Sequence, residues 1–347
     1  MLPHFCILQP SSKPYHLYLM PVLYLKHADI DLEQWNAVVA LSPQRQVYAM
    51  SWYLDVVSPD WEGVVEADAA GIYKAVMPVP WRRKLGMRYV QQPLFCQQLG
   101  VYALETSIPP ATYQAFTEEI YRRFRYVADY HFNTDNQLPT LPRPEVQVEH
   151  TLTLYLNLCS SYEQLYTGYS RDRKMNLKRA QNAALQIEES DDIEPIIRFF
   201  KEETAARIYG GVAEGAYEML RQLYQVLKEK GVGKLYYTVD KQGRQNSGCL
   251  FIFWGGRIVY IFNAAPQHGR KQNGRTLLID HMIREHAGQE VLFDFESPDE
   301  REPDILHFYK SFGPEVKPIP VLKYNRLPKG VKLMREARMR LVRRLRG

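Results

Sequence analysis

Apolar and polar residues alternate in a pattern that predicts two strands and a helix near the C-terminal end of the chain. The run Ser-Gly-Cys-Leu-Phe-Ile-Phe-Trp at 247–254 is followed by the pair Gly255-Gly256 and by a second apolar run at 257–264. Two runs of β-forming residues on either side of Gly-Gly predict a β-hairpin. The polar segment 269–276 then precedes an apolar run at 277–283, which predicts a glycine-containing loop that leads into a helix.

The same reasoning predicts the elements of the preceding residues. A helix is expected at 31–41, with Asp29 or Asp31 as its N-cap. A second helix is expected to start at Pro109-Pro110, because proline fits the first helical turn. Further strands are predicted at 64–66, 72–80, 88–92, 101–105, 126–132 and 149–158, a turn at 81–84, and helices at 161–184 (broken near Gly168), 192–207 and 213–230.

A proline-rich stretch at 138–144 is the best candidate for a domain boundary, since three prolines stiffen the chain there. A chain of 347 residues is long for one domain and suits two. The expected organisation is a disordered or extended segment at 1–19, a first domain at 20–143, a second at 144–328 and a basic helix or tail at 329–347.

The net charge of +5 is unevenly distributed. Residues 329–347 hold eight Lys or Arg and one Glu, a net charge of +7, so the rest of the chain is slightly acidic. This excludes a polybasic nucleic-acid-binding body. The tail could pack on the body, lie on an anionic membrane surface or contact RNA. No apolar run is long enough to cross a bilayer, and residues 17–25 lack the features of a signal peptide. We therefore expect a cytoplasmic protein, with peripheral contact at the inner membrane face as one possibility.

The sequence offers no pattern of metal ligands. Its four cysteines are far apart, and His281 and His286 have no second pair of ligands at metal spacing. We predict neither a metal site nor a tightly bound cofactor.

The loop before residue 277 is a candidate phosphate site. A glycine-containing loop that enters a helix leaves backbone N–H groups unpaired and directed outward, and such groups can hold a phosphate or pyrophosphate.

The order of elements from Asn246 to Gly313 resembles the cofactor half of a GNAT-type acyl-CoA N-acyltransferase domain. In that superfamily a Gln/Arg-x-x-Gly-x-Gly/Ala loop binds the coenzyme A pyrophosphate, and a tyrosine in a Phe-Tyr-x-x-Phe-Gly ending often protonates the leaving thiolate. The matching ending here is 308–313, with Tyr309 as the implied acid. In the loop, Lys271 and Thr276 depart from the pattern and Gly274 fits it, so the donor stays open between acyl-CoA and aminoacyl-tRNA.

The similarity extends over roughly residues 20–328 to bacterial FemAB-like proteins. It rests on the run Val90–Val101, the basic helix Arg173–Ala180 and the segment Phe293–Ser297. FemAB-like proteins have two GNAT-like domains in tandem, and several are peptidyltransferases of peptidoglycan synthesis. The resemblance therefore implies an α/β fold of two domains, each with a mixed, mostly antiparallel sheet flanked by helices.

The resemblance also implies the roles of several residues. In the GNAT arrangement two neighbouring strands splay apart, and a backbone N–H in the gap stabilises the oxyanion. The expected strands are 258–265 and 290–296, with the free N–H near Asn263 or Ala264. The residues expected to hold the donor's phosphate are Lys271, Asn273, Gly274, Arg275 and Thr276.

Asp294 and Glu296 are candidate bases. Alternation with Phe293 and Phe295 places both carboxylates on one side of the strand. A carboxylate beside an apolar wall binds protons more tightly, which suits a base that acts on an ammonium group. The alternative is a structural pair, in which one residue caps the loop before Pro298 and the other pairs with Arg301.

A basic helix supplies candidate substrate-binding residues. Arg171, Lys174 and Lys178 are spaced three and four apart and share one face, which could bind pyrophosphate, a carboxylate or a tRNA phosphate, or could simply be solvated.

Three hypotheses for function follow. The first is transfer of an acyl group from an acyl-CoA-type donor to a small-molecule or peptide amine. The second is a Fem-type peptidyltransferase that uses aminoacyl-tRNA on a cell-wall precursor. The third is a non-catalytic ligand-binding protein with the same fold.

Overall fold

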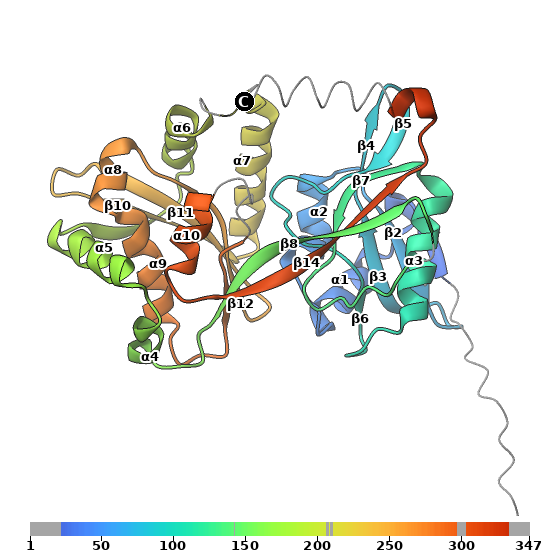
Figure 1. Ribbon diagram of the computed structural model, residues 1–347, viewed down its shortest axis with the longest axis horizontal. Coiled ribbons are helices and arrows are strands. Elements are labelled where there is room, and N and C mark those ends of the chain that lie inside the picture. The colour runs from blue at the N-terminus through green and yellow to red at the C-terminus, as the bar shows by residue number, and fades with distance from the viewer. Residues whose placement is uncertain (1–21, 142, 206–207, 209–210, 297–302, 333–347) are drawn as a thin grey trace, which may run out of the picture.

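Two lobes lie side by side and are joined by two long strands (Figure 1). The computed structural model describes residues 22–141, 143–205, 208, 211–296 and 303–332. We call residues 22–141 the N-terminal lobe and the described residues between 158 and 313 the C-terminal lobe. The joining strands are β8 (Val146–Asn157) and β14 (Glu315–Asn325). The segment predicted at 1–19 and most of the tail predicted at 329–347 lie outside the described residues.

The N-terminal lobe packs helices on an antiparallel sheet with the strand order β1–β2–β3–β6. Its first α-helix begins at Leu32 because the Asp31 carboxylate accepts hydrogen bonds from the backbone N–H groups of Glu33 and Gln34, which identifies the N-cap. The elements are β1 (Val22–Leu25), η1 (His27–Asp29), α1 (Leu32–Leu41), η2 (Val47–Ala49), α2 (Ser51–Val57), β2 (Glu62–Ala67), β3 (Tyr73–Val79), β4 (Trp81–Lys84), β5 (Met87–Val90), β6 (Tyr102–Ala103), α3 (Pro110–Arg123) and β7 (Tyr126–His131).

A ten-stranded mixed sheet extends through both lobes in the order β4–β5–β7–β14–β8–β13–β12–β11–β10–β9. Its pairs are antiparallel except β5 with β7 and β12 with β13. The elements of the C-terminal lobe are α4 (Tyr162–Thr167), α5 (Arg171–Asn182), β9 (Gln186–Ser190), α6 (Glu194–Glu203), α7 (Glu214–Glu229), β10 (Gly233–Val239), β11 (Gln245–Trp254), β12 (Arg257–Ala264), α8 (Gln267–Gln272), α9 (Gly274–Glu285), β13 (Leu292–Asp294) and α10 (Pro303–Lys310). This architecture confirms the predicted α/β class, in which mostly antiparallel sheets are flanked by helices.

Strand β14 connects the two lobes within one sheet. It pairs with β8 over its length and, from Val321 onward, also with β7. Pro318 and Pro320 precede the positions that pair with β7, although the Pro320 carbonyl accepts a hydrogen bond of 2.8 Å from the N–H of Phe132, just after β7. The domain limits predicted from the sequence stay a prediction, since β14 belongs to the predicted second domain and β7 to the first.

The turn predicted at 81–84 is wrong. These residues form β4, which pairs with β5, and the reversal of the chain occurs at Leu85 and Gly86, both with positive φ. No helix among the described residues is long and apolar enough to cross a membrane.

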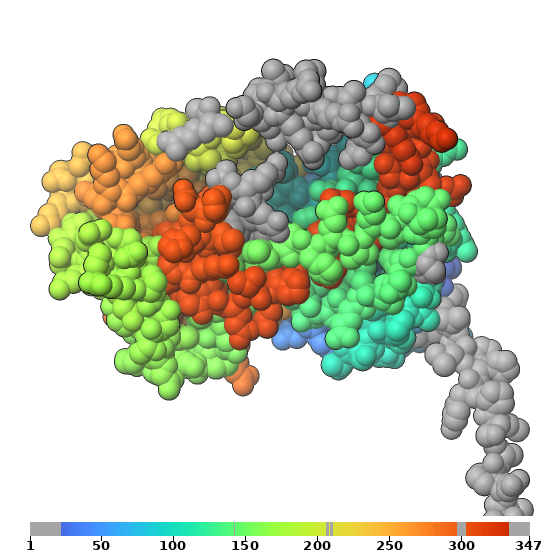
Figure 2. Space-filling view, viewed as in Figure 1, coloured from blue at the N-terminus to red at the C-terminus, as the bar shows by residue number. Residues whose placement is uncertain are grey.

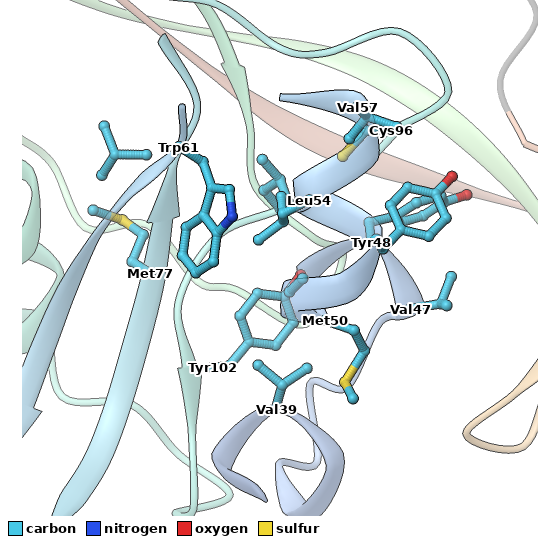
Figure 3. Packing of buried hydrophobic residues seen from close by; sticks show 14 of the residues in the cluster. Val39, Val47, Tyr48, Met50, Leu54, Val57, Trp61, Met77, Cys96 and Tyr102 are labelled. Carbon is cyan, nitrogen blue, oxygen red and sulfur yellow. The ribbon is translucent and has the colours of Figure 1, made fainter. Parts of the chain in front are cut away.

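The main hydrophobic core continues from one lobe into the other. Figure 3 shows part of it, with Trp61 and Met77 at one side and Tyr48 at the other, and with the Tyr48 hydroxyl directed away from the cluster. Residues of α6 and α7 belong to the same core. On the opposite face of the C-terminal sheet, α5, α9 and α10 cover a second apolar cluster that contains Leu278 and Phe312.

Candidate active site

A strand splay opens the sheet at the centre of the C-terminal lobe. Strands β12 and β13 pair in parallel only at their first three positions and separate after the pair Val259–Asp294. Beyond this point β12 bulges: Tyr260 faces Phe251 and Phe262 faces Leu250, so Ile261 is the extra residue. A bulge bends its strand and re-aims the residues that follow. The observed gap agrees with the splay expected from the sequence.

The splay leaves backbone groups of β12 without a strand partner on one side. Asn263 and Ala264 still pair with β11. Successive residues of an antiparallel strand direct their N–H groups to opposite sides, so one of these two N–H groups is directed away from β11, toward the gap.

The loop predicted at 269–276 is helical instead. Helices α8 and α9 are separated by Asn273 alone, in the left-handed conformation with φ 59°. Its side chain forms no cap hydrogen bond. Gly274, Arg275 and Thr276 form the first turn of α9, and the Leu277 N–H donates to the carbonyl of Asn273, the residue before the helix. The N–H groups of a first turn have no partner within their own helix, so this turn takes the place of the predicted loop as the candidate phosphate site.

The two glycines of this segment are required by close packing on the sheet. A Cβ on Gly269 would lie 1.6 Å from the carbonyl oxygen of Asn246, and a Cβ on Gly274 would lie 2.3 Å from the Thr238 hydroxyl oxygen and 2.6 Å from that of Ser247. No side chain larger than hydrogen fits at either position without displacing β10 or β11. The glycines thus fix where the N-terminus of α9 lies.

A cavity of about 580 Å³ lies where α9 begins and β12 ends. It reaches α10 at Phe308, the residue before Tyr309. In Figure 2 the red-orange surface of α10 adjoins the yellow-green surface of α4 and α5, and a hydrogen bond of 2.9 Å from the Ser170 N–H to the Ser311 carbonyl links them. The lining residues include Arg173, Asn176, Asn263, Ala264, Asn273, Gly274, Arg275, Thr276 and Phe308.

Two guanidinium groups that form no ion pair within the described residues face this cavity, whose lining also includes Glu203, Arg270 and Asp304. The guanidinium carbons of Arg173 and Arg275 lie 4.1 Å and 3.9 Å from the ring centre of Phe308. Arg173 donates to the hydroxyls of Ser311, at 2.8 Å, and Thr276, while Arg275 donates to the Asn263 side-chain oxygen at 2.9 Å. No ion pair to an acidic side chain is formed by either arginine within the described residues.

The surroundings of Arg173 lower the pKa of its guanidinium group. Burial, and after it the positive charge of Arg275, lowers the pKa of Arg173 to about 10. Two neighbouring cations in contact with one ring, beside the first turn of a helix, attract an anion, because each contributes positive potential to the same space.

Most of the predicted donor-binding residues come together here. Asn263, Ala264, Asn273, Gly274, Arg275 and Thr276 all line the cavity. Lys271 does not; it is exposed on α8. The buried Thr276 hydroxyl holds Arg173 in place.

Tyr309 is buried at the base of α10. Its ring contacts the rings of Tyr260 and Phe295 at centre-to-centre distances of 5.9 Å and 5.6 Å. Burial raises the pKa of Tyr309, whereas the charge of Arg275 and a hydrogen bond with the Asn263 side chain act to lower it. Tyr309 does not line the cavity itself, but it forms a hydrogen bond with the Asn263 side chain, which does. A neutral hydroxyl at this position can donate a proton to a leaving group.

Asp294 and Glu296 lie together where β13 ends. Asp294 is fully buried; one carboxylate oxygen accepts hydrogen bonds of 2.9 Å from the Thr153 hydroxyl and the Glu296 N–H, and the other has no partner among the described residues. Burial raises the pKa of Asp294 to about 6, although Arg257 acts to lower it. Burial also raises the pKa of Glu296 to about 8; a hydrogen bond from Tyr48 acts to lower this pKa, and the charge of Asp294 raises it further.

The structural alternative for this pair is met in part, because Asp294 caps the backbone of Glu296. Pro298 and Arg301 lie outside the described residues.

The predicted substrate-binding face lies elsewhere on α5. Arg171, Lys174 and Lys178 border a shallow depression beside Tyr166, whereas Arg173 and Asn176 of the same helix line the cavity. The two sets of basic residues therefore do not form one site. Among the described residues, no group of His, Cys, Asp or Glu side chains is arranged to hold a metal ion.

Three residues of the site were not identified from the sequence. Arg173 precedes Leu177 and Ala180 by four and seven residues, so it shares their buried face, and an arginine on an apolar stripe is a signal that could have been used. Phe308 and Tyr48 had no such signal.

Comparisons with known proteins agree with this geometry. A sequence model of the acetyltransferase (GNAT) domain family matches residues 170–310. No curated protein sequence matches the chain at a significant level. FemX shares the fold with a TM-score of 0.60 and 12% identity, over 87% of this chain and 97% of that chain.

Two further solved structures have the same fold. A tandem GNAT protein from the clavulanic acid biosynthesis pathway gives a TM-score of 0.51 and 12% identity, over 89% of this chain and 100% of that chain. L-PGS from Bacillus licheniformis gives 0.50 and 10%, over 91% and 97%. Residues 170–310 therefore resemble the acetyltransferase (GNAT) domain family in sequence, and the chain as a whole shares the fold of FemX and of the tandem GNAT protein, as predicted from its sequence.

Proposed function

We propose that this protein is an N-acyltransferase that transfers an acyl group from a phosphate-bearing donor to an amine. The observation that carries the proposal is the cavity in which the first turn of α9 and two guanidinium groups that form no ion pair within the described residues lie beside the splayed strand. A donor phosphate would supply the missing negative charge, held by Gly274, Arg275 and Thr276 together with Arg173.

The remaining groups suit the chemistry of acyl transfer. The amine attacks the acyl carbonyl, a C–N bond forms, and the bond from the carbonyl carbon to the donor's sulfur or oxygen breaks. An N–H near Asn263 or Ala264 stabilises the oxyanion. Glu296, with Asp294 beside it, accepts the proton from the ammonium group, and Tyr309 gives a proton to the leaving thiolate or alkoxide.

An acyl-CoA-type donor is the first choice, because the pyrophosphate of coenzyme A carries the negative charge that a helix N-terminus and two arginines would bind. Aminoacyl-tRNA is the alternative, and the exposed basic face of Arg171, Lys174 and Lys178 favours it, since an RNA backbone could extend onto that face. The acceptor would be a small-molecule amine or, in the second case, the amine of a peptidoglycan precursor.

Melting temperatures measured with coenzyme A, acyl-CoAs, nucleotide sugars and tRNA would test the proposal, because a ligand that binds only the folded state raises the melting temperature. Saturable stabilisation by coenzyme A favours the first donor. Stabilisation by tRNA that weakens steeply with salt favours the second.

A purely ligand-binding role predicts a different result. The parent protein would then transfer no acyl group, and Tyr309→Phe and Asp294→Asn would leave ligand binding unchanged. In an N-acyltransferase these variants would bind donor normally and transfer the acyl group more slowly.

A further inference from the structure

The carboxylate of Glu296 is held by a residue of the other lobe. The Tyr48 hydroxyl donates a hydrogen bond to Oε1 of Glu296 across 248 residues of sequence. Tyr48 has no exposed surface, and Glu296 is partly exposed. The hydroxyl thus extends from a closed core to a side chain that is partly accessible to solvent.

Tyr48 is rigidly positioned. It belongs to the 3-10 helix η2, and its ring meets that of Tyr53 edge-on, with the centres 5.6 Å apart. The same segment contacts the C-terminal lobe at a second point, where Nε of Arg45 donates to the Gly255 carbonyl at 3.0 Å. Two contacts in four residues fix this segment against the hairpin β11–β12 and against Glu296.

Glu296 has an unusual backbone conformation, so the hydrogen bond from Tyr48 to its side chain helps to hold the residue in place. Its φ is 57°, in the left-handed region that residues with a side chain rarely adopt. Its N–H is bound to Asp294, which fixes the main chain but leaves the side chain free to rotate. The side-chain hydrogen bond seen for Glu296 among the described residues comes from Tyr48.

We propose that Tyr48 is a positioning residue of the acyltransferase site, which holds the Glu296 carboxylate in the orientation that accepts the proton of the attacking amine. This role rests on the proposed function. It makes the N-terminal lobe part of the proton-transfer apparatus, because deletion of one phenolic oxygen in that lobe would alter the base in the other.

The charge state of Glu296 provides the readout. The titratable groups that face it are Asp294, Tyr48, Tyr53, Cys96 and Tyr309. A hydrogen bond to a carboxylate stabilises the charged form, so its loss raises the pKa. Hydrogen bonds to charged groups correspond to roughly one to two pKa units.

The test compares Tyr48→Phe with Tyr53→Phe. Both remove a hydroxyl from a fully buried tyrosine, but the Tyr53 hydroxyl donates to the Phe95 carbonyl instead of to Glu296. Transfer is measured from pH 5.5 to 10 in the presence of a donor that stabilises the parent protein. For Tyr48→Phe we expect the ascending limb of kcat to move upward by about one unit, with a roughly tenfold lower kcat at pH 7 and an unchanged KM for the donor. Tyr53→Phe should keep the parent profile.

A second measurement does not depend on activity. The pH dependence of unfolding is recorded for the same variants and in a Glu296→Gln background. Tyr48→Phe should extend the pH range over which stability declines, and it should have no such effect once residue 296 is Gln.

The outcomes separate the two proposals. Transfer by the parent protein with an unshifted kcat profile in Tyr48→Phe overturns the role of Tyr48 alone. No transfer by the parent protein with any donor overturns the proposed function and this role with it. A shift that persists in the Glu296→Gln background also overturns the role, because Tyr48 would then act on another group.

Discussion

Replacement of Arg275 by Gln should weaken donor binding while it leaves the stability of the unliganded protein almost unchanged. The variant loses the contact with the Phe308 ring, about 0.5–1 kcal/mol, and the hydrogen bond to Asn263, about 1 kcal/mol. It also removes the repulsion that helps to lower the pKa of Arg173 from 12.5 to about 10. That change corresponds to about 3 kcal/mol, of which burial is the larger cause, so relief of the repulsion returns at most about 1.5 kcal/mol.

These contributions nearly cancel, so the free energy of unfolding should change by about 1 kcal/mol or less.

In donor binding, the loss of the Arg275 charge is not offset by a compensating gain. A charge-assisted hydrogen bond to a phosphate is worth about 1.5–3 kcal/mol, which predicts a Kd roughly 10- to 150-fold higher.

The assay is a titration of melting temperature with coenzyme A, in which the increase reports RT ln(1 + [L]/Kd). Arg284→Gln is the matched control. It lies on the same helix, stacks on Tyr162 at 4.2 Å and is remote from the cavity, so it should bind as the parent protein does. Equal affinity of Arg275→Gln and the parent protein, or equal weakening by both substitutions, would contradict the electrostatic account of the site.

Three further predictions concern other parts of the site. Gly274→Ala should destabilise the protein by about 1–3 kcal/mol in urea unfolding, because its Cβ would meet two buried hydroxyls. Gly215→Ala is the control: a Cβ there meets open space, so the variant should be neutral or stabilising. Equal effects of the two substitutions would disprove the packing argument. Burial raises the pKa of Asp294 from 3.8 to about 6, so the contribution of this group to stability should be full below pH 4 and fall by about 3 kcal/mol as the pH rises to 6. Asp294→Asn should remove this contribution from the pH profile of unfolding, and a profile identical to that of the parent protein would argue against it. Tyr309→Phe should retain donor binding and lower kcat by about 10- to 1000-fold, most strongly for donors with poor leaving groups; full activity would exclude Tyr309 as the acid.

Sequence reasoning predicted several elements around the candidate site but not the geometry within it. The Gly-Gly hairpin, the helix after residue 273 and the gap between β12 and β13 followed from local patterns and from the resemblance, because turn chemistry and period are encoded locally. The loop at 269–276 was expected to be irregular, since its polar composition hides the fact that Gly269 and Gly274 allow two short helices to lie directly on the sheet.

Contacts between residues far apart in the sequence could not be predicted from local patterns. Nothing near Tyr48 indicates that its hydroxyl meets Glu296. No strand was predicted at 315–325, where two prolines interrupt the pattern, yet β14 is central where it pairs with both β7 and β8. Arg173 was assigned to the basic helix as a whole, whereas its burial depends on the packing of α5 against α9 and α10, which a single helix pattern does not specify.

The pairing of β7 with β14 has a consequence for synthesis on the ribosome. When β7 (residues 126–131) leaves the ribosome, almost two hundred residues must still be synthesised before β14, the strand that pairs with its free edge, is available. An uncovered strand edge can pair with strands of other chains. The nascent chain therefore exposes an aggregation-prone edge during much of translation. Native assembly is completed only when the last strand is released and inserted, and premature termination before Glu315 should therefore yield an aggregating fragment instead of a smaller functional protein.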